Sequence, residues 1–265
     1  MKNKVIMLAM LGSCLLFAGL INYNPMQDFT LDTIHIVKNA DIKPNTNNLT
    51  SAITISLPYI SDFNNSKISK KINKEIIKSY LGENYMNCTP KNAADQYAHD
   101  FLSQLTGIEN SLLKTKDELK HNFFIQNIVK GEIINNRILC IENFYAESNG
   151  KLKTKLNYQN IDLKTGKVIA LKDIFEKNYE ASLKGIIINK IFEALQIQEN
   201  RVLKDAEIIK LEHALNISNN FKINSSGLSF YYSLPNWVKN CKSEISITLP
   251  NNIIGELLKK EYQFI

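Results

Sequence analysis

The sequence predicts an α+β fold: an antiparallel meander sheet covered by a long helix, with a smaller N-terminal α+β part. Strand-like segments joined by short turns follow one another over residues 121–162, which favours antiparallel neighbours. From residue 173 to 198, large apolar residues recur at every fourth position, as on the buried face of a helix. One further strand and two helical patterns occupy residues 50–105 and predict the N-terminal part.

The first residues predict export. A short basic start, Met1–Lys4, is followed by an uncharged apolar run, Val5–Ile21. We interpret residues 1–24 as a signal peptide or an N-terminal membrane anchor, because the run is at the lower limit of length for spanning a bilayer. Leu11-Gly-Ser-Cys14 resembles a bacterial lipobox and makes Cys14 a candidate lipidation site. All three alternatives place the protein in the periplasm or the outer cell envelope, anchored to the membrane only if this segment is retained or lipidated.

The N-terminal part begins with strands. Leu31–Val37 is a candidate strand, and Thr50–Tyr59 alternates apolar and polar residues until Pro58, which we expect to end it. A helix follows, with Ser66 or Asn65 as its N-cap and isoleucines at four-residue spacing.

A second helix is expected to start at Thr89-Pro90, a capping residue followed by proline in the first turn. Gly107 is expected to end it.

The meander occupies the centre of the chain. Its predicted strands are His121–Val129, Arg137–Tyr145 and Leu152–Tyr158, and its turns are at 135–136 and 148–150. Residues 160–175 then read as strand, turn, short strand and helix start. Gly166 can adopt the positive φ of the turn, and Asp173 lies where a carboxylate caps a helix.

The C-terminal third continues the α+β pattern. The predicted elements are a long helix from Asp173 to Gln198, a helix at Asp205–Asn216, a hairpin at Phe221–Tyr232 turning at 225–227, a strand at Ser243–Leu249 and a helix at Ile253–Tyr262.

Several of these segments resemble a known family. Asp162-Leu-Lys-Thr-Gly-Lys167 with Leu171-Lys-Asp-Ile-Phe175, the 221–232 hairpin and Ile245–Leu249 are similar, in order and spacing, to the RsiV-type C-terminal domain. This is an exported bacterial domain of unknown function (DUF). Residues 55–59 and the helix after them resemble the PdaC/RsiV-like N-terminal domain that usually precedes it. The resemblance implies domains at 50–117 and 118–265.

The resemblance also implies a class of ligand. The RsiV domain is the extracytoplasmic part of an anti-sigma factor that binds lysozyme, and in PdaC the domain accompanies a separate polysaccharide deacetylase domain. Only four residues precede the apolar run here, so no cytoplasmic sigma-binding segment is expected, and no deacetylase domain is expected after the C-terminal helix.

Composition and motifs point away from several function classes. The net charge of +6 comes from scattered lysines rather than from an arginine stripe, so no nucleic-acid partner is predicted. The four histidines lack metal-ligand spacing, and nucleophile-elbow, P-loop and dinucleotide motifs are absent from the sequence. No cofactor, metal site or catalytic residue is therefore predicted. A pair of acidic residues acting on a glycan stays open, since sequence does not give their separation.

Beyond Cys14 there are three cysteines. Cys140 lies in an apolar strand and is expected to be buried, whereas Cys88 and Cys241 lie in polar loops. In an oxidising envelope we predict a disulfide between Cys88 and Cys241, with Cys140 left as a free thiol.

Tyr231, Tyr232 and Trp237 form the aromatic cluster that could bind a partner. Exposed rings stack on sugars or anchor proteins. The alternative is that Phe230 and Tyr232 pack into the sheet while Trp237 covers the core.

The sequence as a whole predicts an exported, non-catalytic cell-envelope protein that binds a protein or glycan ligand, with lysozyme or peptidoglycan as the precedents. The alternative is an envelope hydrolase or deacetylase acting on peptidoglycan.

Overall fold

The computed structural model describes residues 29–42, 49–61, 66–115, 123–149, 151–199, 205–233 and 244–263, and it confirms the α+β class. A six-stranded sheet has the order β1-β2-β3-β4-β5-β6, and a three-stranded sheet has the order β7-β8-β9. The strands of the larger sheet are β1 Thr30–Ile42, β2 Leu49–Ser61, β3 Phe123–Ile134, β4 Ile138–Asn149, β5 Leu152–Asp162 and β6 Lys167–Val168. Those of the smaller sheet are β7 Phe221–Asn224, β8 Gly227–Ser233 and β9 Glu244–Pro250.

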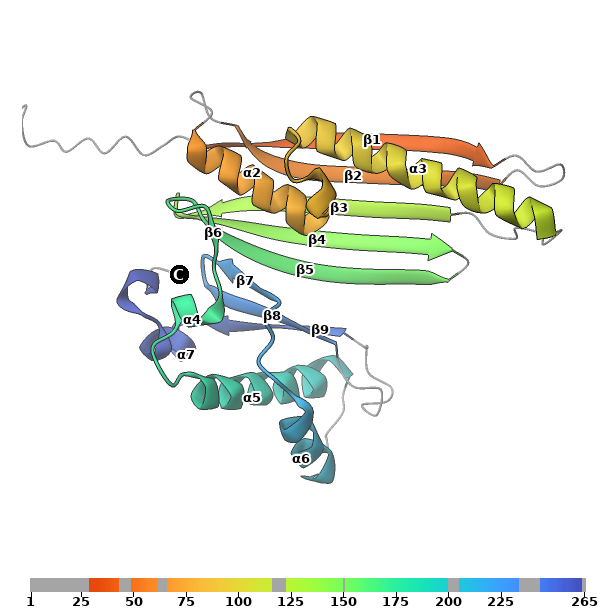
Figure 1. Ribbon diagram of the computed structural model, residues 1–265. Helices are drawn as coiled ribbons and strands as arrows, with labels where there is room; N and C mark the ends of the chain where they lie inside the picture. The colour runs from red at the N-terminus through yellow and green to blue at the C-terminus, as the bar shows by residue number, and fades with distance from the viewer. Residues whose placement is uncertain are drawn as a thin grey trace, which may run out of the picture.

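The elements are stacked in layers (Figure 1). Helices α2 (Lys67–Tyr80) and α3 (Pro90–Thr115) lie on one face of the large sheet, beside the short 3-10 helix η1 (Glu83–Tyr85). The small sheet lies on the opposite side, beneath β4 and β5, and α5 (Glu180–Glu199) covers it. Helix α6 (Asp205–Ala214) follows α5.

Two hydrophobic cores follow from this layering, because side chains alternate along a strand. Leu139 and Ile141 of β4 pack toward α2 and α3. Ile138 and Cys140 of the same strand pack against the small sheet and α5. Strand β4 thus contributes buried residues to both cores.

The large sheet is mixed. The meander from β3 to β6 is antiparallel as predicted, but β2 pairs with β3 in parallel, from Ser51 with Phe123 to Ser56 with Ile128. The predicted boundary between residues 117 and 118 falls between the described residues 115 and 123. The elements on its two sides share this one sheet.

Four helix ends show which capping residues act. Ser66 caps α2 by accepting a hydrogen bond from the Ser69 N–H, and Thr89 accepts one from the Asn92 N–H at the start of α3. Gly82, with φ of 109°, follows the last turn of α2. The expectation that Gly107 ends α3 is wrong, since the helix continues to Thr115. Glycine within a helix costs only about 1 kcal/mol relative to alanine, which a long helix tolerates.

The expected end of β2 at Pro58 is also wrong. The strand runs on to Ser61, and Pro58 lies opposite Thr33 of β1. Pro58 is beyond Ser56, the last residue of β2 that pairs with β3. Proline is tolerated where a strand has a neighbour on one side only.

Turn residues behave as their chemistry predicts. Asn135 and Asn136 both have positive φ, as the tight turn between β3 and β4 requires. Gly166 has φ of 62° in the turn before β6. Gly227 is more constrained, because a Cβ there would lie 2.0 Å from the Leu249 carbonyl oxygen of the neighbouring strand.

The single long helix predicted from Asp173 is wrong. A short helix, α4 (Leu171–Ile174), comes first, and Phe175 then forms an isolated bridge with Leu258 before α5 begins at Glu180. Asp173 does act in the first turn, where its carboxylate accepts a hydrogen bond from the Ala170 N–H at 2.9 Å.

The C-terminal helix is likewise shorter than predicted. Helix α7 spans Asn251–Ile254 and is followed by two 3-10 turns, η2 (Gly255–Leu257) and η3 (Lys260–Tyr262). Residues around α4 bind this segment, with Glu176 N–H donating to Leu257 O and Lys259 N–H donating to Ile174 O, both at 2.9 Å. Tertiary pairing thus replaces the regular helix that the apolar pattern alone would form.

Candidate functional site

A polar groove runs along the outer edge of β5. This edge is open because β6 pairs with β5 only at Ile161 and Asp162. The groove has a volume of about 340 Å³. Its lining is rich in amides and hydroxyls, and consists of Ser79, Tyr80, Lys155, Asn157, Tyr158, Gln159, Asn160, Val168, Ile169, Asn219 and Phe221. We call it the β5 groove.

One side chain closes part of this edge. The Asn220 amide accepts a hydrogen bond from the Tyr158 N–H at 2.6 Å and donates one to the Leu156 carbonyl at 2.7 Å. It thereby satisfies two backbone groups that a neighbouring strand would otherwise pair. The Ile169 N–H donates to the Asn160 carbonyl at 2.8 Å and closes the other end.

Buried amides adjoin the groove. Asn127 donates to the Tyr80 carbonyl at 2.8 Å, and Asn143 lies opposite Asn157 across β4 and β5. Both asparagines are almost fully buried, with 1% and 5% exposure. Their Oδ1 atoms have no donor among the described residues, and neither do the Tyr80 hydroxyl and Gln159 Oε1. Buried polar atoms of this kind normally find a partner, and because these four are closed off from the surface, ordered water is the partner they can accept.

Tyrosines contribute aromatic faces to the site. The Tyr158 ring packs edge-on against Tyr231 of β8, with 6.5 Å between ring centroids. Burial, together with the nearby charge of Glu142, raises the pKa of Tyr158. Burial also raises the pKa of Tyr231, helped by a hydrogen bond with Glu244. Both phenols therefore stay neutral and can donate and accept hydrogen bonds at neutral pH.

The predicted aromatic residues divide between surface and core. Tyr231 is half-buried and lies next to the groove through Tyr158. Tyr232 is 8% exposed, and its hydroxyl accepts a hydrogen bond from the Ser218 N–H at 3.1 Å, so it packs in the core as the alternative interpretation holds. Trp237 lies outside the described residues.

The cysteine predictions are tested only in part. Cys140 is buried as expected, and burial raises the pKa of its thiol to about 12. Cys88 is half-buried, and its thiol donates to the Gln96 side chain at 3.6 Å. Its predicted partner Cys241 and the lipidation candidate Cys14 lie outside the described residues, so both assignments stay predictions.

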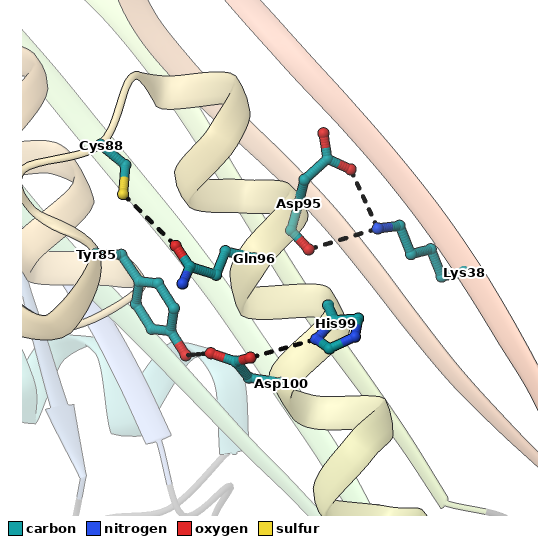
Figure 2. A network of polar contacts seen from close by, with 7 residues as sticks. All are labelled: Lys38, Tyr85, Cys88, Asp95, Gln96, His99 and Asp100. Atoms are coloured by element: carbon teal, nitrogen blue, oxygen red, sulfur yellow. Dashed lines mark hydrogen bonds and ion pairs between the residues drawn. The ribbon is translucent and has the colours of Figure 1, made fainter.

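A second polar network lies along α3 (Figure 2). The Tyr85 hydroxyl donates to Asp100 at 2.9 Å, and the other oxygen of Asp100 is 3.4 Å from His99 Nδ1. On the opposite side of the helix, Lys38 of β1 pairs with Asp95 at 3.1 Å. These contacts join α3 to η1 and to β1, and we interpret them as structural.

A triad of Glu147, Lys153 and Tyr145 lies farther along the sheet. Glu147 accepts hydrogen bonds from Lys153 Nζ and from the Tyr145 hydroxyl, both at 2.9 Å. The bond from Lys153, followed by that from Tyr145, lowers the pKa of Glu147. The carboxyl group is therefore kept ionised, which is the opposite of what a general acid requires.

Replacing Lys153 with methionine is expected to raise the pKa of Glu147 toward its usual value, because the largest cause of the depression is removed. Carboxyl-carbon NMR titration measures this directly, with Lys151→Met as the matched control. The depressed pKa stabilises the fold above the pKa of Glu147 in the unfolded chain, and this contribution is lost as the pH falls through the folded pKa. An unchanged titration curve in Lys153→Met would contradict the triad.

Asn157 of the groove and the two buried asparagines beside it were not predicted from the sequence. Asn127, Asn143 and Asn157 each interrupt an otherwise strand-like segment, which is the one local signal of their presence. Asn143 lies directly opposite Asn157, and Asn127 lies diagonally across from Asn143, so their proximity depends on strand register. Among the described residues there is no group of three or more side chains that could hold a metal ion, and no described helix is long and apolar enough to cross a membrane. The predicted export segment, residues 1–24, lies outside this part of the chain.

The fold belongs to a class of α+β architectures already seen in proteins of unknown function. The chain matches no protein-family model and no curated protein by sequence. It is similar in structure to a DUF3298 family member from Bacteroides fragilis, with a TM-score of 0.70 and 18% identity over 89% of this chain and 95% of that one. A DUF3298 family protein from Pseudomonas aeruginosa aligns with a TM-score of 0.56 and 12% identity, over 89% of this chain and 98% of that one. These likenesses establish a DUF3298-like fold.

Proposed function

We propose that this chain is an exported, non-catalytic cell-envelope protein whose β5 groove binds a glycan of the peptidoglycan type. The observation that carries the proposal is the convergence of neutral amide and hydroxyl groups along one open strand edge. Amides and hydroxyls both donate and accept hydrogen bonds, as the hydroxyl and acetamide groups of such a glycan require. Lys155 adds one cation for a carboxylate, and Tyr158 adds an aromatic ring.

Two sequence features support the cellular setting. Residues 1–24 have the pattern of an export segment. The resemblance to the RsiV-type domain, with a PdaC-like domain before it, makes lysozyme a second candidate ligand at the cell envelope. The assignment to an RsiV-type domain preceded by a PdaC-like domain, which is finer than a DUF3298-like fold, is part of the proposal. Attachment to the membrane would come only from the N-terminal segment, if it is retained or lipidated at Cys14.

Calorimetric titration with soluble peptidoglycan fragments tests the proposal. Asn157→Ala is expected to weaken binding several-fold, since one hydrogen bond contributes about 0.5–1.5 kcal/mol. Gln126→Ala, which removes an exposed strand amide outside the groove, should leave the affinity unchanged.

Three other outcomes would count against the proposal. Binding of lysozyme without binding of glycan would mean that the ligand is a protein rather than a glycan. Fragment binding that is equally strong in Asn157→Ala and in the unaltered protein would move the site elsewhere. Release of sugars or acetate from peptidoglycan would favour the hydrolase or deacetylase alternative.

A further inference from the structure

Strand β1 presents a long open edge. It forms one side of the six-stranded sheet and pairs with β2 without interruption, from Thr30 with Ser61 to Ile42 with Leu49. No other strand of the described chain pairs with β1, which is the outermost arrow of the sheet in Figure 1. Edge strands in soluble proteins are usually kept short, bulged, interrupted by proline or protected by charged side chains. Strand β1 has 13 residues, a continuous register and no proline.

The side chains of β1 suit a neighbouring strand. Val37 is 67% exposed although it lies in the middle of a regular strand. Ile34 and Ile36 point to the other face, where they are half-buried against the core that α2 and α3 cover. A further strand beside β1 would cover the remaining apolar surface of all three residues.

The sequence of β1 is complementary to itself. In an antiparallel pair of two β1 strands centred on His35, Asp32 of each strand lies opposite Lys38 of the other, and Ile34 lies opposite Ile36. Centring the pair one residue earlier places Asp32 opposite Ile36, and centring it one residue later places Asp32 opposite Ala40. Among these three registers, only the one centred on His35 matches the opposite charges. It also keeps both copies of each apolar pair on the same face, as antiparallel pairing requires.

We propose that β1 pairs with β1 of a second copy of this chain, antiparallel and with a two-fold axis at His35, to form a continuous twelve-stranded sheet. Such an interface is isologous, and each contact occurs twice. The occupant is identified by the charge pattern, since an unrelated strand would have no reason to match Asp32 and Lys38 at this spacing.

The existing contacts of these charges fit this arrangement. Lys38 Nζ is 3.1 Å from Asp95 Oδ1, and the Lys38 side chain is still 37% exposed. Asp32 accepts a hydrogen bond from the Ser61 hydroxyl with one of its two oxygens. Each Lys38 would therefore lie between Asp95 of its own chain and Asp32 of the second copy. Both carboxylates are negative and would attract the Lys38 ammonium group.

Charge reversal in the purified full chain tests the pairing. Sedimentation equilibrium is expected to show a concentration-dependent dimer. Lys38→Glu and Asp32→Lys should each weaken dimerisation about tenfold or more, because two symmetric attractions become repulsions. The double variant Asp32→Lys/Lys38→Glu exchanges the charges and, with Asp95→Asn added so that the carboxylate introduced at position 38 does not face a carboxylate of its own chain, should restore the dimer. A protein that is monomeric at every concentration, or a charge-exchanged variant no better than the single ones, would overturn the proposal.

Cysteine cross-linking tests the register. His35→Cys places two thiols directly across the two-fold axis, and oxidation should give a 35–35 disulfide identified by peptide mass mapping. Val37→Cys is the matched control, since residue 37 would lie opposite Thr33 and its own copy would be well beyond the 7 Å between Cα atoms that a disulfide spans. A dimer that cross-links through residue 37 but not through residue 35 would refute the register, and dimers that cross-link at neither position would place the interface elsewhere.

Discussion

Replacing Asn160 with alanine is expected to lower the free energy of unfolding by about 2–5 kcal/mol, because this side chain joins the two sheets. Asn160 lies on β5 and is 1% exposed. Its Nδ2 donates to the Phe221 carbonyl at 2.8 Å, and its Oδ1 accepts from the Ile223 N–H at 2.9 Å. Alanine would leave a donor and an acceptor of β7 buried without partners, and each would cost about 1–3 kcal/mol.

Urea denaturation followed by circular dichroism measures this loss. Asn157→Ala is the matched control: it lies on the same strand three residues away, and its side chain makes no hydrogen bond to the other described residues. We expect its stability to stay within about 0.5 kcal/mol of the unaltered protein. The two variants also separate stability from binding, because Asn157→Ala is the variant expected to weaken glycan binding. Equal losses of stability in both variants would contradict the bridging role of Asn160.

Asn160 also shows how far the sequence predicts this fold. The strand, turn and helix start of residues 160–175 depend on neighbouring residues, and Gly166 and Asp173 act there as expected. The partners of Asn160 are 61 and 63 residues farther along the chain. Local chemistry carries no information about that pairing. The residue could be placed in a strand, but its role as a bridge between sheets could not be predicted.

The same limit applies to the candidate site. Alternation along β8 correctly places Tyr232 inside, and it leaves Tyr231 on the other face, where it meets Tyr158. The parallel pairing of β2 with β3 was not predicted, because it depends on how α2 and α3 carry the chain back across the sheet. The groove requires that strand register, the end of α2 and the segment before β7 all meet at one edge. No single stretch of sequence contains that information.

Replacing Phe175 with alanine is expected to lower the free energy of unfolding by about 3–5 kcal/mol, through lost burial and the cavity that remains. Phe175 is 1% exposed and stacks on Tyr179, with 4.8 Å between ring centroids. It is also the residue at which the predicted long helix breaks, and its bridge to Leu258 explains why. An extended backbone at this position lets the ring fill the core and lets the main chain bind the C-terminal segment.

Phe144→Ala is the matched control, because its ring is 41% exposed on β4, and we expect it to cost less than about 1 kcal/mol. Hydrogen exchange adds a local readout. If Phe175 holds the C-terminal segment, the amides of Glu176 and Lys259, which bond across the bridge, should exchange faster in Phe175→Ala than the amides of β3 and β4. Uniform acceleration throughout the protein would mean instead that the C-terminal segment and the large sheet unfold as one cooperative unit. The break in the helix would then stabilise the whole core rather than its C-terminal edge.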